Sequence, residues 1–345
     1  MRRWSVEKAQ AWGERQPWFF GANFCPSTAI NQLEMWQKET FDPETIEREL
    51  GLAQGIGMNI MRVYLHDLLW EHDRDGFIER IEQYLAIADA KGIRTMFVIF
   101  DDCWKGDFAL GPQPEPEPYT HNSGWIQSPG HPVVEDPTQW PRLERYVKEL
   151  LNHFKEDQRI AVWDLYNEPG NGVDGVANLG TQRAGKSIPL VRETFAWARS
   201  IVGMTQPLTV GFWCPQEDMN ECVLELSDII SFHGYDQIDK ALSGDGTLAD
   251  KVARACEQGR PAICTEYLAR AVGSTFEKSG RYLKDHGVGA INWGLVSGKS
   301  QTIYPWGWTR EQGEPELCFH DVFKKDGSLL HPEELEILRE LGEVI

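Results

Sequence analysis

Two glutamates close two separate apolar segments, and carboxylates in that position suit acid–base and nucleophilic chemistry. Glu168 follows the apolar run 160–166, and Glu266 ends a second run, 261–265. The chain between them is long enough for about three β/α units of ~30 residues each. Carboxylates on the tips of two parallel strands meet at the same end of a sheet. Glycoside hydrolysis needs such a pair, because one carboxyl protonates the leaving oxygen while the other attacks or stabilises the sugar cation.

The segment 160–169 predicts how Glu168 is presented. Its apolar residues are typical of a buried strand, and the turn residues Pro169 and Gly170 follow at once. Proline cannot donate to a sheet hydrogen bond, so Glu168 is expected to project from the strand tip. Asn167 beside it offers an amide that can hydrogen-bond a sugar hydroxyl. α/β-barrels place their catalytic groups at this end of their strands.

Eight apolar segments alternate with helical patterns along the chain. Several helical patterns begin with capping residues, such as Asp42 and the Thr247/Asp250 pair. Regular alternation with a count of eight predicts a single-domain α/β fold, a (β/α)8 TIM barrel over residues 1–345, with a short helix at about 5–15 before the barrel. An open doubly wound sheet is the alternative, but no GxGxxG follows the first strand and no Walker A sequence occurs. The expected strands are residues 17–23, 59–65, 93–100, 160–168, 208–213, 227–235, 261–266 and 288–294, and the expected later helices are residues 42–55, 77–90, 141–155, 187–202, one after Thr247, one capped by Ser274 and one near Pro332.

Two long segments without periodicity follow predicted strands three and eight. Residues 102–140 are rich in proline and glycine, and residues 296–330 hold Trp306 and Trp308. Both begin at the C-terminal end of a strand, and the β/α alternation resumes after the first, so they favour a lid or a subsite wall over a domain linker. Such loops favour a walled pocket and exo action on oligosaccharides. The sequence leaves the choice between exo and endo cleavage open.

The composition argues against several classes of partner. The net charge of −19 argues against nucleic acid and anionic membranes, because phosphate binding depends on Lys and Arg. No run approaches the ~18 consecutive apolar residues of a membrane span, and the N-terminus lacks the apolar segment of a signal peptide, so we expect a cytoplasmic protein. The 7 cysteines form no CxxC pair and no cluster with metal-ligand spacing, which predicts reduced thiols and no metal site. The oligomeric state does not follow from the sequence.

Polar and aromatic residues recur at the predicted strand ends and would converge on one mouth of a barrel. They are Arg62, Asp101, Asp102, Asn167, Glu168, His233, Tyr235, Glu266 and Trp293. Apart from Asp101 and Asp102, these residues resemble the pattern of clan A retaining glycoside hydrolases, closest to glycoside hydrolase family 5. The resemblance keeps the order of the residues and covers nearly the whole chain. The opening segments 23–28 and 31–37 also resemble a bacterial group labelled cellulase-like or xylanase-like.

This resemblance implies a retaining O-glycosyl hydrolase in which Glu168 is the acid/base and Glu266 the nucleophile. We expect Arg62 to keep Glu266 ionised and Glu168 to carry the raised pKa. No metal or organic cofactor is implied. The other matching residues are implied to bind the substrate: Arg62 and Tyr235 around the nucleophile, Asn167 at the sugar 2-hydroxyl, His233 in the pocket and Trp293 beneath the reacting sugar.

One segment departs from the family pattern. Family 5 members usually carry a histidine shortly after strand three, whereas here Phe100 is followed by Asp101, Asp102, Cys103 and Trp104. We predict that Asp101 or Asp102 faces the barrel mouth and binds hydroxyls of the non-reducing sugar, the alternative being a structural acid that caps the loop. Trp104 is a candidate substrate-binding surface for a sugar ring. The departure leaves the sugar and its linkage open.

The sequence therefore predicts a retaining β-glycosidase that hydrolyses β-linked oligo- or polysaccharides by double displacement. Two alternatives stay open. A transglycosylase would use the same residues and differ in whether water or a sugar accepts the intermediate. A non-catalytic carbohydrate-binding barrel would show affinity for sugars without turnover.

Overall fold

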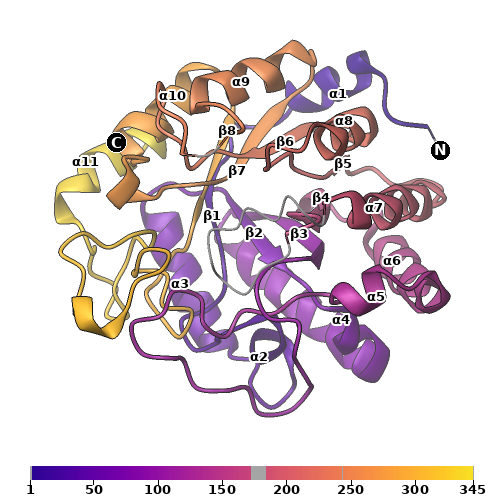
Figure 1. Cartoon of the computed structure of the whole chain (residues 1–345), viewed down its shortest axis with the longest axis horizontal. Coiled ribbons are helices and arrows are strands. Elements are labelled where there is room, and N and C mark those ends of the chain that lie inside the picture. The colour runs from indigo at the N-terminus through magenta and orange to yellow at the C-terminus, as the bar shows by residue number, and fades with distance from the viewer. Residues whose placement is uncertain (1, 172–183, 243, 345) are drawn as a thin grey trace.

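The computed structural model describes residues 2–171, 184–242 and 244–344, and in this part of the chain eight parallel strands form one sheet. The strands follow the order β5-β4-β3-β2-β1-β8-β7-β6. The two ends of the sheet meet where Phe212 pairs with Phe232, so the sheet curls into a nearly closed barrel (Figure 1). The predicted (β/α)8 fold is confirmed. The strands are β1 (Phe20–Asn23), β2 (Ile60–Tyr64), β3 (Arg94–Asp101), β4 (Ile160–Asn167), β5 (Leu208–Thr209), β6 (Ile230–His233), β7 (Ala262–Tyr267) and β8 (Gly289–Trp293).

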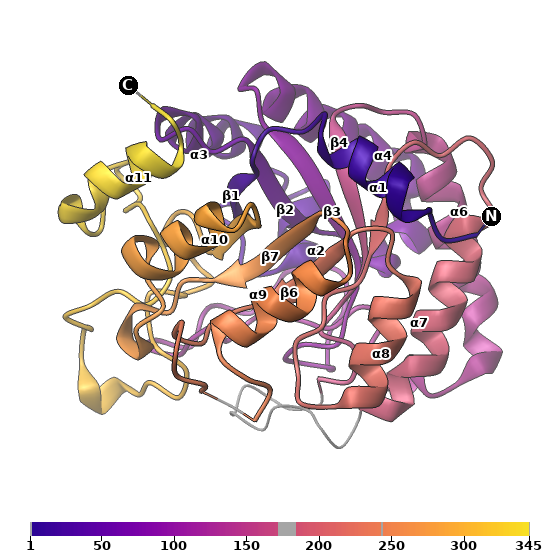
Figure 2. The ribbon, with the colours of Figure 1, turned by 90° about the horizontal axis from the view of Figure 1, so that it is seen from above.

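Helices cover the outer face of the strands (Figure 2). In α6, for example, Leu143, Val147 and Leu150 recur on one side of the helix and are buried, which is the pattern of a helix packed on a sheet. The glycine-rich sequence 169–186 after β4 predicts a loop, and most of this segment lies outside the described residues. The helices are α1 (Val6–Gly13), α2 (Gln32–Trp36), α3 (Pro43–Gly55), α4 (Asp67–Ala90), α5 (His131–Val134), α6 (Trp140–Phe154), α7 (Ala184–Arg199), α8 (Glu217–Leu226), α9 (Leu248–Glu257), α10 (Arg281–Asp285) and α11 (Leu335–Leu341).

Two helix starts follow from capping chemistry that the sequence shows. The side chain of Asp42 accepts a hydrogen bond from the backbone N–H of Thr45 at the start of α3 (3.0 Å). Thr247 and Asp250 form a reciprocal capping box at the start of α9. Both starts are confirmed, because a cap satisfies local backbone donors and depends little on the rest of the fold.

Several boundaries differ from the prediction, and three of them have a visible cause or a large difference. The cap expected at Ser274 is Thr275 instead, because the Ser274 hydroxyl accepts a hydrogen bond from the backbone N–H of Leu268 (3.3 Å). The helix expected at 77–90 begins at Asp67. Its first turns are separated from the rest by the non-helical residue Asp73, which interrupts the apolar periodicity. Strand β5 is also shorter than the segment expected for it.

The barrel interior changes from apolar to charged to aromatic along β2. Residues two apart in a strand point to the same side, so Ile60, Arg62 and Tyr64 share the inner face. Ile60 belongs to an apolar cluster at the start of the strands, which Trp12 of α1 helps to close. Arg62 is fully buried above that cluster, and Tyr64 lies with Trp293 in an upper aromatic cluster. The charged layer is therefore held just beneath the barrel mouth.

The long loops after β3 and β8 lie side by side and are joined by hydrogen bonds (Figure 1). The backbone N–H of Asn122 donates to the carbonyl of Ser300 (2.9 Å), and Gln301 Nε2 donates to the carbonyl of Glu117 (2.7 Å). Since both loops begin at C-terminal ends of strands, together they form a wall beside the barrel mouth.

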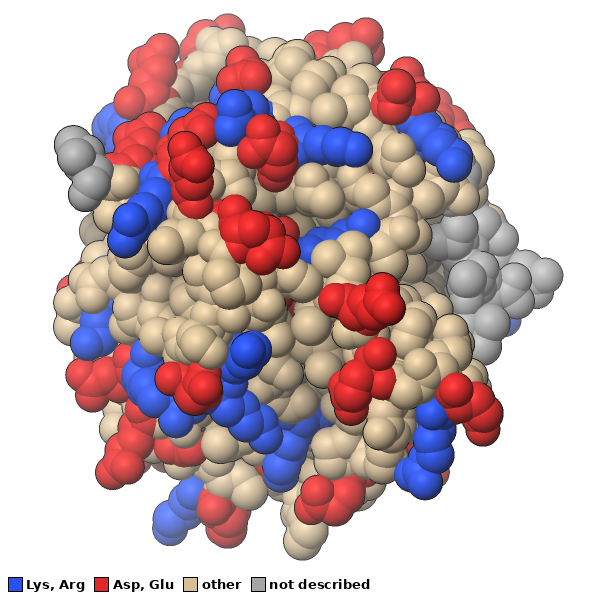
Figure 3. All heavy atoms as spheres, turned by 90° about the vertical axis from the view of Figure 1, so that its left-hand side faces the viewer, with Lys and Arg blue, Asp and Glu red and all other residues tan. Residues whose placement is uncertain are grey.

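The exterior carries acidic and basic side chains interspersed over the face shown in Figure 3. Across the described ranges, every helix is too short or too polar to span a bilayer.

Candidate active site

Glu266 lies near the end of β7 with donors on both of its oxygens. Arg62 Nη1 (2.8 Å) and the hydroxyl of Tyr64 (3.0 Å) contact Oε1. The hydroxyl of Tyr235, after β6, donates to Oε2 (2.8 Å). The side chain of Glu266 is only 6% exposed. Three donors, two from β2 and one from the segment after β6, therefore fix the orientation of this carboxylate and stabilise its negative charge.

Arg62 is the buried cation that organises the charged layer. Its Nε and Nη2 both donate to Asp164 Oδ2, at 2.9 and 2.8 Å. Nη2 also donates to Asn167 Oδ1 (2.7 Å), and Nη1 donates to Asn23 Oδ1 (2.9 Å). A buried charge is tolerated only when it is paired and hydrogen-bonded, and here the guanidinium has a partner on every side. The same group thus positions Asn167 of β4 and Glu266 of β7.

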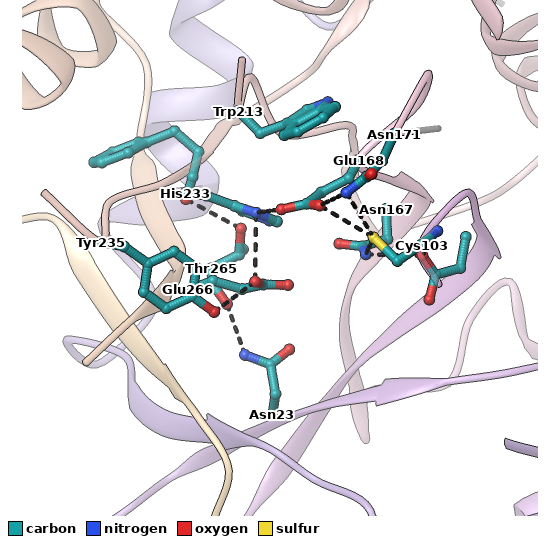
Figure 4. A network of polar contacts seen from close by, with 12 residues as sticks. Asn23, Cys103, Asn167, Glu168, Asn171, Trp213, His233, Tyr235, Thr265 and Glu266 are labelled. Carbon is teal, nitrogen blue, oxygen red and sulfur yellow. Dashed lines mark hydrogen bonds and ion pairs between the residues drawn. The ribbon is translucent and has the colours of Figure 1, made fainter. Parts of the chain in front are cut away.

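Glu168 follows directly after β4 and has an unusual backbone conformation. Its φ of 43° lies in the left-handed region, which is strained for a residue other than glycine and is concentrated at functional sites. Its side chain is 15% exposed. Oε1 contacts His233 Nδ1 (2.7 Å), while Oε2 accepts from Asn171 Nδ2 (2.6 Å) and contacts Cys103 Sγ (3.0 Å) (Figure 4). The carboxylate is therefore held from three sides.

These contacts reverse the pKa shift expected for Glu168. Burial acts to raise the pKa of this carboxyl, but the contacts with His233, Cys103 and Asn171 together outweigh burial and lower the pKa. The raised pKa predicted from the sequence is therefore wrong for the protein without substrate. The sequence could not show this, because two of the three partners, His233 and Cys103, come from segments far from Glu168 in the chain.

His233, at the end of β6, lies between the two glutamates (Figure 4). Its Nδ1 is 2.7 Å from Glu168 Oε1 and 3.4 Å from Glu266 Oε2. The imidazole nitrogen and one oxygen from each glutamate all lie within 4.8 Å of one another. Two carboxylates and an imidazole are also a donor set for a transition-metal ion. The buried guanidinium of Arg62 beside Glu266 opposes a second cation at this place.

Asp101 is a buried residue that contacts Asn167 rather than either glutamate. It is 1% exposed, accepts from Asn167 Nδ2 (2.9 Å) through Oδ1, and accepts from Trp125 Nε1 (2.8 Å) through Oδ2. Burial raises the pKa of Asp101 to about 7. These contacts favour a role in orienting Asn167 over the direct sugar contact expected from the sequence.

Asp102 is fully buried and points to other partners. Its Oδ1 accepts from the hydroxyl of Tyr166 (2.7 Å), and its Oδ2 accepts from the hydroxyl of Ser187 and the backbone N–H of Gly170 (2.6 Å each). Burial also raises the pKa of Asp102. The aspartate ties the turn after β4 to α7, which is the loop-anchoring role that the sequence left as the alternative.

Aromatic rings line the mouth on both sides. Trp293 is 9% exposed and meets Tyr64 edge-on at 5.8 Å between ring centroids. Trp104, in the loop after β3, stacks on His121 at 5.5 Å. Trp306, in the loop after β8, is 37% exposed and packs edge-on against Tyr235 at 5.0 Å. Both long loops thus bring flat apolar surface to the mouth.

Sequence reasoning did not assign several residues of this network. Tyr64 was detectable, because it lies two residues after Arg62 in a strand and so shares its face. Asp164 was also detectable, because an acid inside an otherwise apolar strand needs a buried cation. The contact of Cys103 with Glu168 had no signal in the sequence, since it depends on how the loop after β3 approaches the turn after β4. Asn171 was detectable, because it lies in the same turn as Glu168.

Comparison with known proteins places this site in a recognised family. The family model Cellulase (glycosyl hydrolase family 5) matches residues 20–299. A 36-residue stretch is 47% identical to a probable mannan endo-1,4-beta-mannosidase C of Aspergillus terreus, and this match covers only 10% of the chain and 9% of that relative.

Solved structures share the fold at low sequence identity. A GH5_18 protein from Bifidobacterium longum in complex with Manb1-4GlcNAc has a TM-score of 0.63 and 14% identity, covering 95% of this chain and 78% of that one. An exo-beta-1,4-mannosidase from an Opitutaceae bacterium has a TM-score of 0.62 and 17% identity, covering 94% and 58%. An endo-1,4-beta-D-mannanase from Thermotoga petrophila has a TM-score of 0.57 and 15% identity, covering 95% and 99%.

Proposed function

The chain belongs to glycosyl hydrolase family 5, and on this premise we propose that it is a retaining β-glycosidase with Glu266 as nucleophile and Glu168 as acid/base. The observation that carries the proposal is the short distance between the two carboxylates. One oxygen of each lies within 4.8 Å of the other. Retaining glycosidases hold their carboxyl groups ~5–5.5 Å apart, whereas inverting enzymes need ~6.5–9.5 Å to admit a water molecule.

The partners of the two carboxylates separate their roles. Glu266 is bound by Arg62, which can only donate and does not lose its proton, so the negative charge of this carboxylate is stabilised throughout the reaction. Glu168 is bound by His233 and Cys103, both of which can donate or accept. Such partners can hydrogen-bond the carboxyl of Glu168 both when it is charged and when it is protonated. That is what an acid/base residue requires, because it changes protonation state twice in each cycle.

The reaction then runs in two displacements. In the first, a Glu266 oxygen forms a bond to the anomeric carbon while the glycosidic bond breaks and the Glu168 proton goes to the leaving oxygen. In the second, Glu168 takes a proton from water, and the water oxygen attacks the anomeric carbon and releases Glu266. The sugar leaves with its original anomeric configuration, and Glu168 is protonated again.

Substrate binding supplies the proton state that the first step needs. In the free protein the contact with His233 contributes to the lowered pKa of Glu168, and burial acts in the opposite direction. A sugar that enters between the two glutamates would displace His233 from Glu168. Loss of the His233 contact, which is the largest of the interactions that lower the pKa of Glu168, would then shift this carboxyl toward its protonated form.

Azide rescue of two variants tests the assignment. Glu168→Ala removes the proton donor and keeps the nucleophile, so a nitrophenyl glycoside should still form the glycosyl-enzyme, and azide should release it as the β-glycosyl azide. Glu266→Ala removes the nucleophile, so direct attack by azide should give the α-azide. Glu217→Ala, an exposed change on α8, is the control and should behave as wild type. Proton NMR of the products decides: the opposite anomers would reverse the roles, and no rescue in either variant would reject the pair.

We further propose that the substrate is a β-linked oligosaccharide cut from its end. The hydrogen-bonded wall formed by the loops after β3 and β8 supports this, because two joined loops beside the mouth favour a walled pocket over an open groove. β-1,4-Mannosides are the first substrates to test, since the short curated match and the similar structures are named for such sugars. Size separation of early products from end-labelled mannooligosaccharides tests the proposal. Single sugars support exo cleavage, whereas intermediate lengths show endo cleavage.

A further inference from the structure

Cys103 lies against Glu168 in the segment after β3 where the chain departs from the family pattern. Its sulfur is 3.0 Å from Glu168 Oε2, and the residue is 5% exposed. Its backbone N–H donates to Asp101 Oδ1 (2.9 Å), which fixes the residue to the end of β3. Figure 4 shows the sulfur directed into the polar network rather than away from it.

The direction of the hydrogen bonds at this sulfur follows from Arg62. A guanidinium only donates, so Asn167 must turn Oδ1 toward Arg62 Nη2 (2.7 Å) and Nδ2 away from it. Asn167 Nδ2 then donates to Asp101 and to Cys103 Sγ (3.3 Å). Because the sulfur accepts from the amide, its single proton is available to Glu168.

A thiol is an unusual partner for a carboxyl because it can reverse its direction. The S–H group donates to Glu168 when the carboxyl is charged, and the sulfur can accept the carboxyl proton when Glu168 is neutral. The amide nitrogen of Asn171, at 2.6 Å from the same oxygen, can only donate and so favours the charged form. Of these two partners, only Cys103 remains a partner in both halves of the reaction.

We propose that Cys103 is a positioning residue for the acid/base: its thiol holds the Glu168 carboxyl in both protonation states and helps to set the pH range in which Glu168 works. This inference rests on the proposed role of Glu168. In the described ranges, the other titratable groups that face Glu168 are His233 of β6, Tyr235 after β6, Glu266 of β7 and Cys214 after β5. None of these groups belongs to the segment after β3, so a change at Cys103 alters the surroundings of Glu168 from one side only.

The test compares Cys103→Ala and Cys103→Ser over a range of pH. The basic limb of kcat/KM reports the acid of the free enzyme. Alanine removes a donor that favours the charged carboxyl, so this limb should move up by about half a pH unit, a shift that corresponds to a weak net hydrogen bond. Serine keeps a hydroxyl donor, so its limb should lie at or below that of wild type. Cys222→Ala, which removes a buried thiol from α8, is the matched control and should leave the limb in place.

The leaving group separates positioning from general damage. A glycoside with a poor leaving group needs the proton of Glu168, so Cys103→Ala should lower its kcat/KM several-fold. A dinitrophenyl glycoside leaves without a proton, so its kcat/KM should be nearly unchanged. An unmoved basic limb, or equal losses on both substrates, overturns the inference while the two-glutamate mechanism stands. If Glu168→Ala itself leaves the poor substrate unaffected, the proposed function fails and the inference fails with it.

Infrared spectroscopy tests the same contact without activity. The difference between wild type and Cys103→Ala isolates the S–H stretching band of Cys103. In a Glu168→Gln background the acceptor is neutral and weaker, so this band should move toward the frequency of a free thiol. A band at the same frequency in both backgrounds would show that the thiol does not donate to Glu168.

Discussion

Replacing Arg62 by methionine should expose how the charged layer is held together. Arg62 is 1% exposed and is the cation between two carboxylates, Asp164 (1% exposed) and Glu266 (6% exposed). Methionine has a similar length but no donors, so both acids would lose their ion pair while buried. Breaking a buried pair from one side costs about 3–5 kcal/mol. We therefore expect Arg62→Met to lower the free energy of unfolding by about that amount near neutral pH.

A second variant separates charge from packing. Arg62→Met combined with Asp164→Asn removes the cation and one of the carboxylates that depend on it. If charge causes the loss, the double variant should regain at least about 1 kcal/mol relative to Arg62→Met, because interacting sites are not additive. Equilibrium urea unfolding, followed by the fluorescence of the 14 tryptophans, measures all three proteins. A double variant less stable than Arg62→Met would refute the electrostatic explanation and leave packing as the cause.

The same pair of variants should differ in pH dependence. Burial raises the pKa of Asp164 even though Arg62 acts to lower it. A carboxyl with a higher pKa in the folded than in the unfolded chain favours folding below its unfolded pKa of about 4, and this contribution is lost as the pH rises. Without Arg62 the pKa of Asp164 should rise further. The loss of unfolding free energy caused by Arg62→Met should thus be largest at neutral pH and should shrink toward about pH 4. In the double variant this loss should depend much less on pH.

Three further predictions concern the neighbouring acids and metal ions. Asp101→Asn should lower kcat/KM, because Asp101 orients Asn167. The raised pKa of Asp101, about 7, means that its carboxyl favours folding below about pH 4 and loses this contribution as the pH rises through about 7. The melting temperature of the Asp101→Asn variant should therefore fall less over this pH range than that of wild type. Asp102→Asn should instead lower the melting temperature with little change in KM, since its partners anchor the turn after β4; equal kinetic losses in both variants would contradict this division. Dialysis against EDTA should leave activity unchanged, and a loss restored by Zn²⁺ would make Glu168, His233 and Glu266 a metal centre.

The fold could be predicted from the sequence because its signals are local. Continuous apolar runs mark buried parallel strands, and caps such as Asp42 and Thr247 mark helix starts whatever the surrounding fold. The predicted helix boundaries were wrong where the apolar periodicity was interrupted or where a potential capping residue had another hydrogen-bond partner. Asp73 interrupts the periodicity of α4, and the Ser274 hydroxyl serves the backbone of Leu268 rather than a helix.

The site was predictable only as far as strand ends converge. Glu168 and Glu266 could be brought together because barrel topology places both strand tips at one mouth. The pKa of Glu168 could not be predicted, because its direction depends on side chains from loops and other strands meeting within hydrogen-bond distance. Asp101 and Asp102 show the same limit. They are adjacent in the sequence, yet one faces Asn167 and the other faces Ser187.

The charge balance of the layer beneath the mouth also bears on the proposed mechanism. Arg62 is the permanent cation that contacts both Asp164 and Glu266, so these two carboxylates together carry one more negative charge than Arg62 neutralises. Glycoside hydrolysis passes through a transition state in which the sugar carries positive charge. A fixed surplus of negative charge therefore stabilises the transition state more than the neutral substrate, and no reorganisation is needed at the moment of reaction. The positive charge of Arg62 thus neutralises part of the negative charge of Asp164 and Glu266, which allows both acids to stay buried. The negative charge that remains stabilises the positively charged sugar.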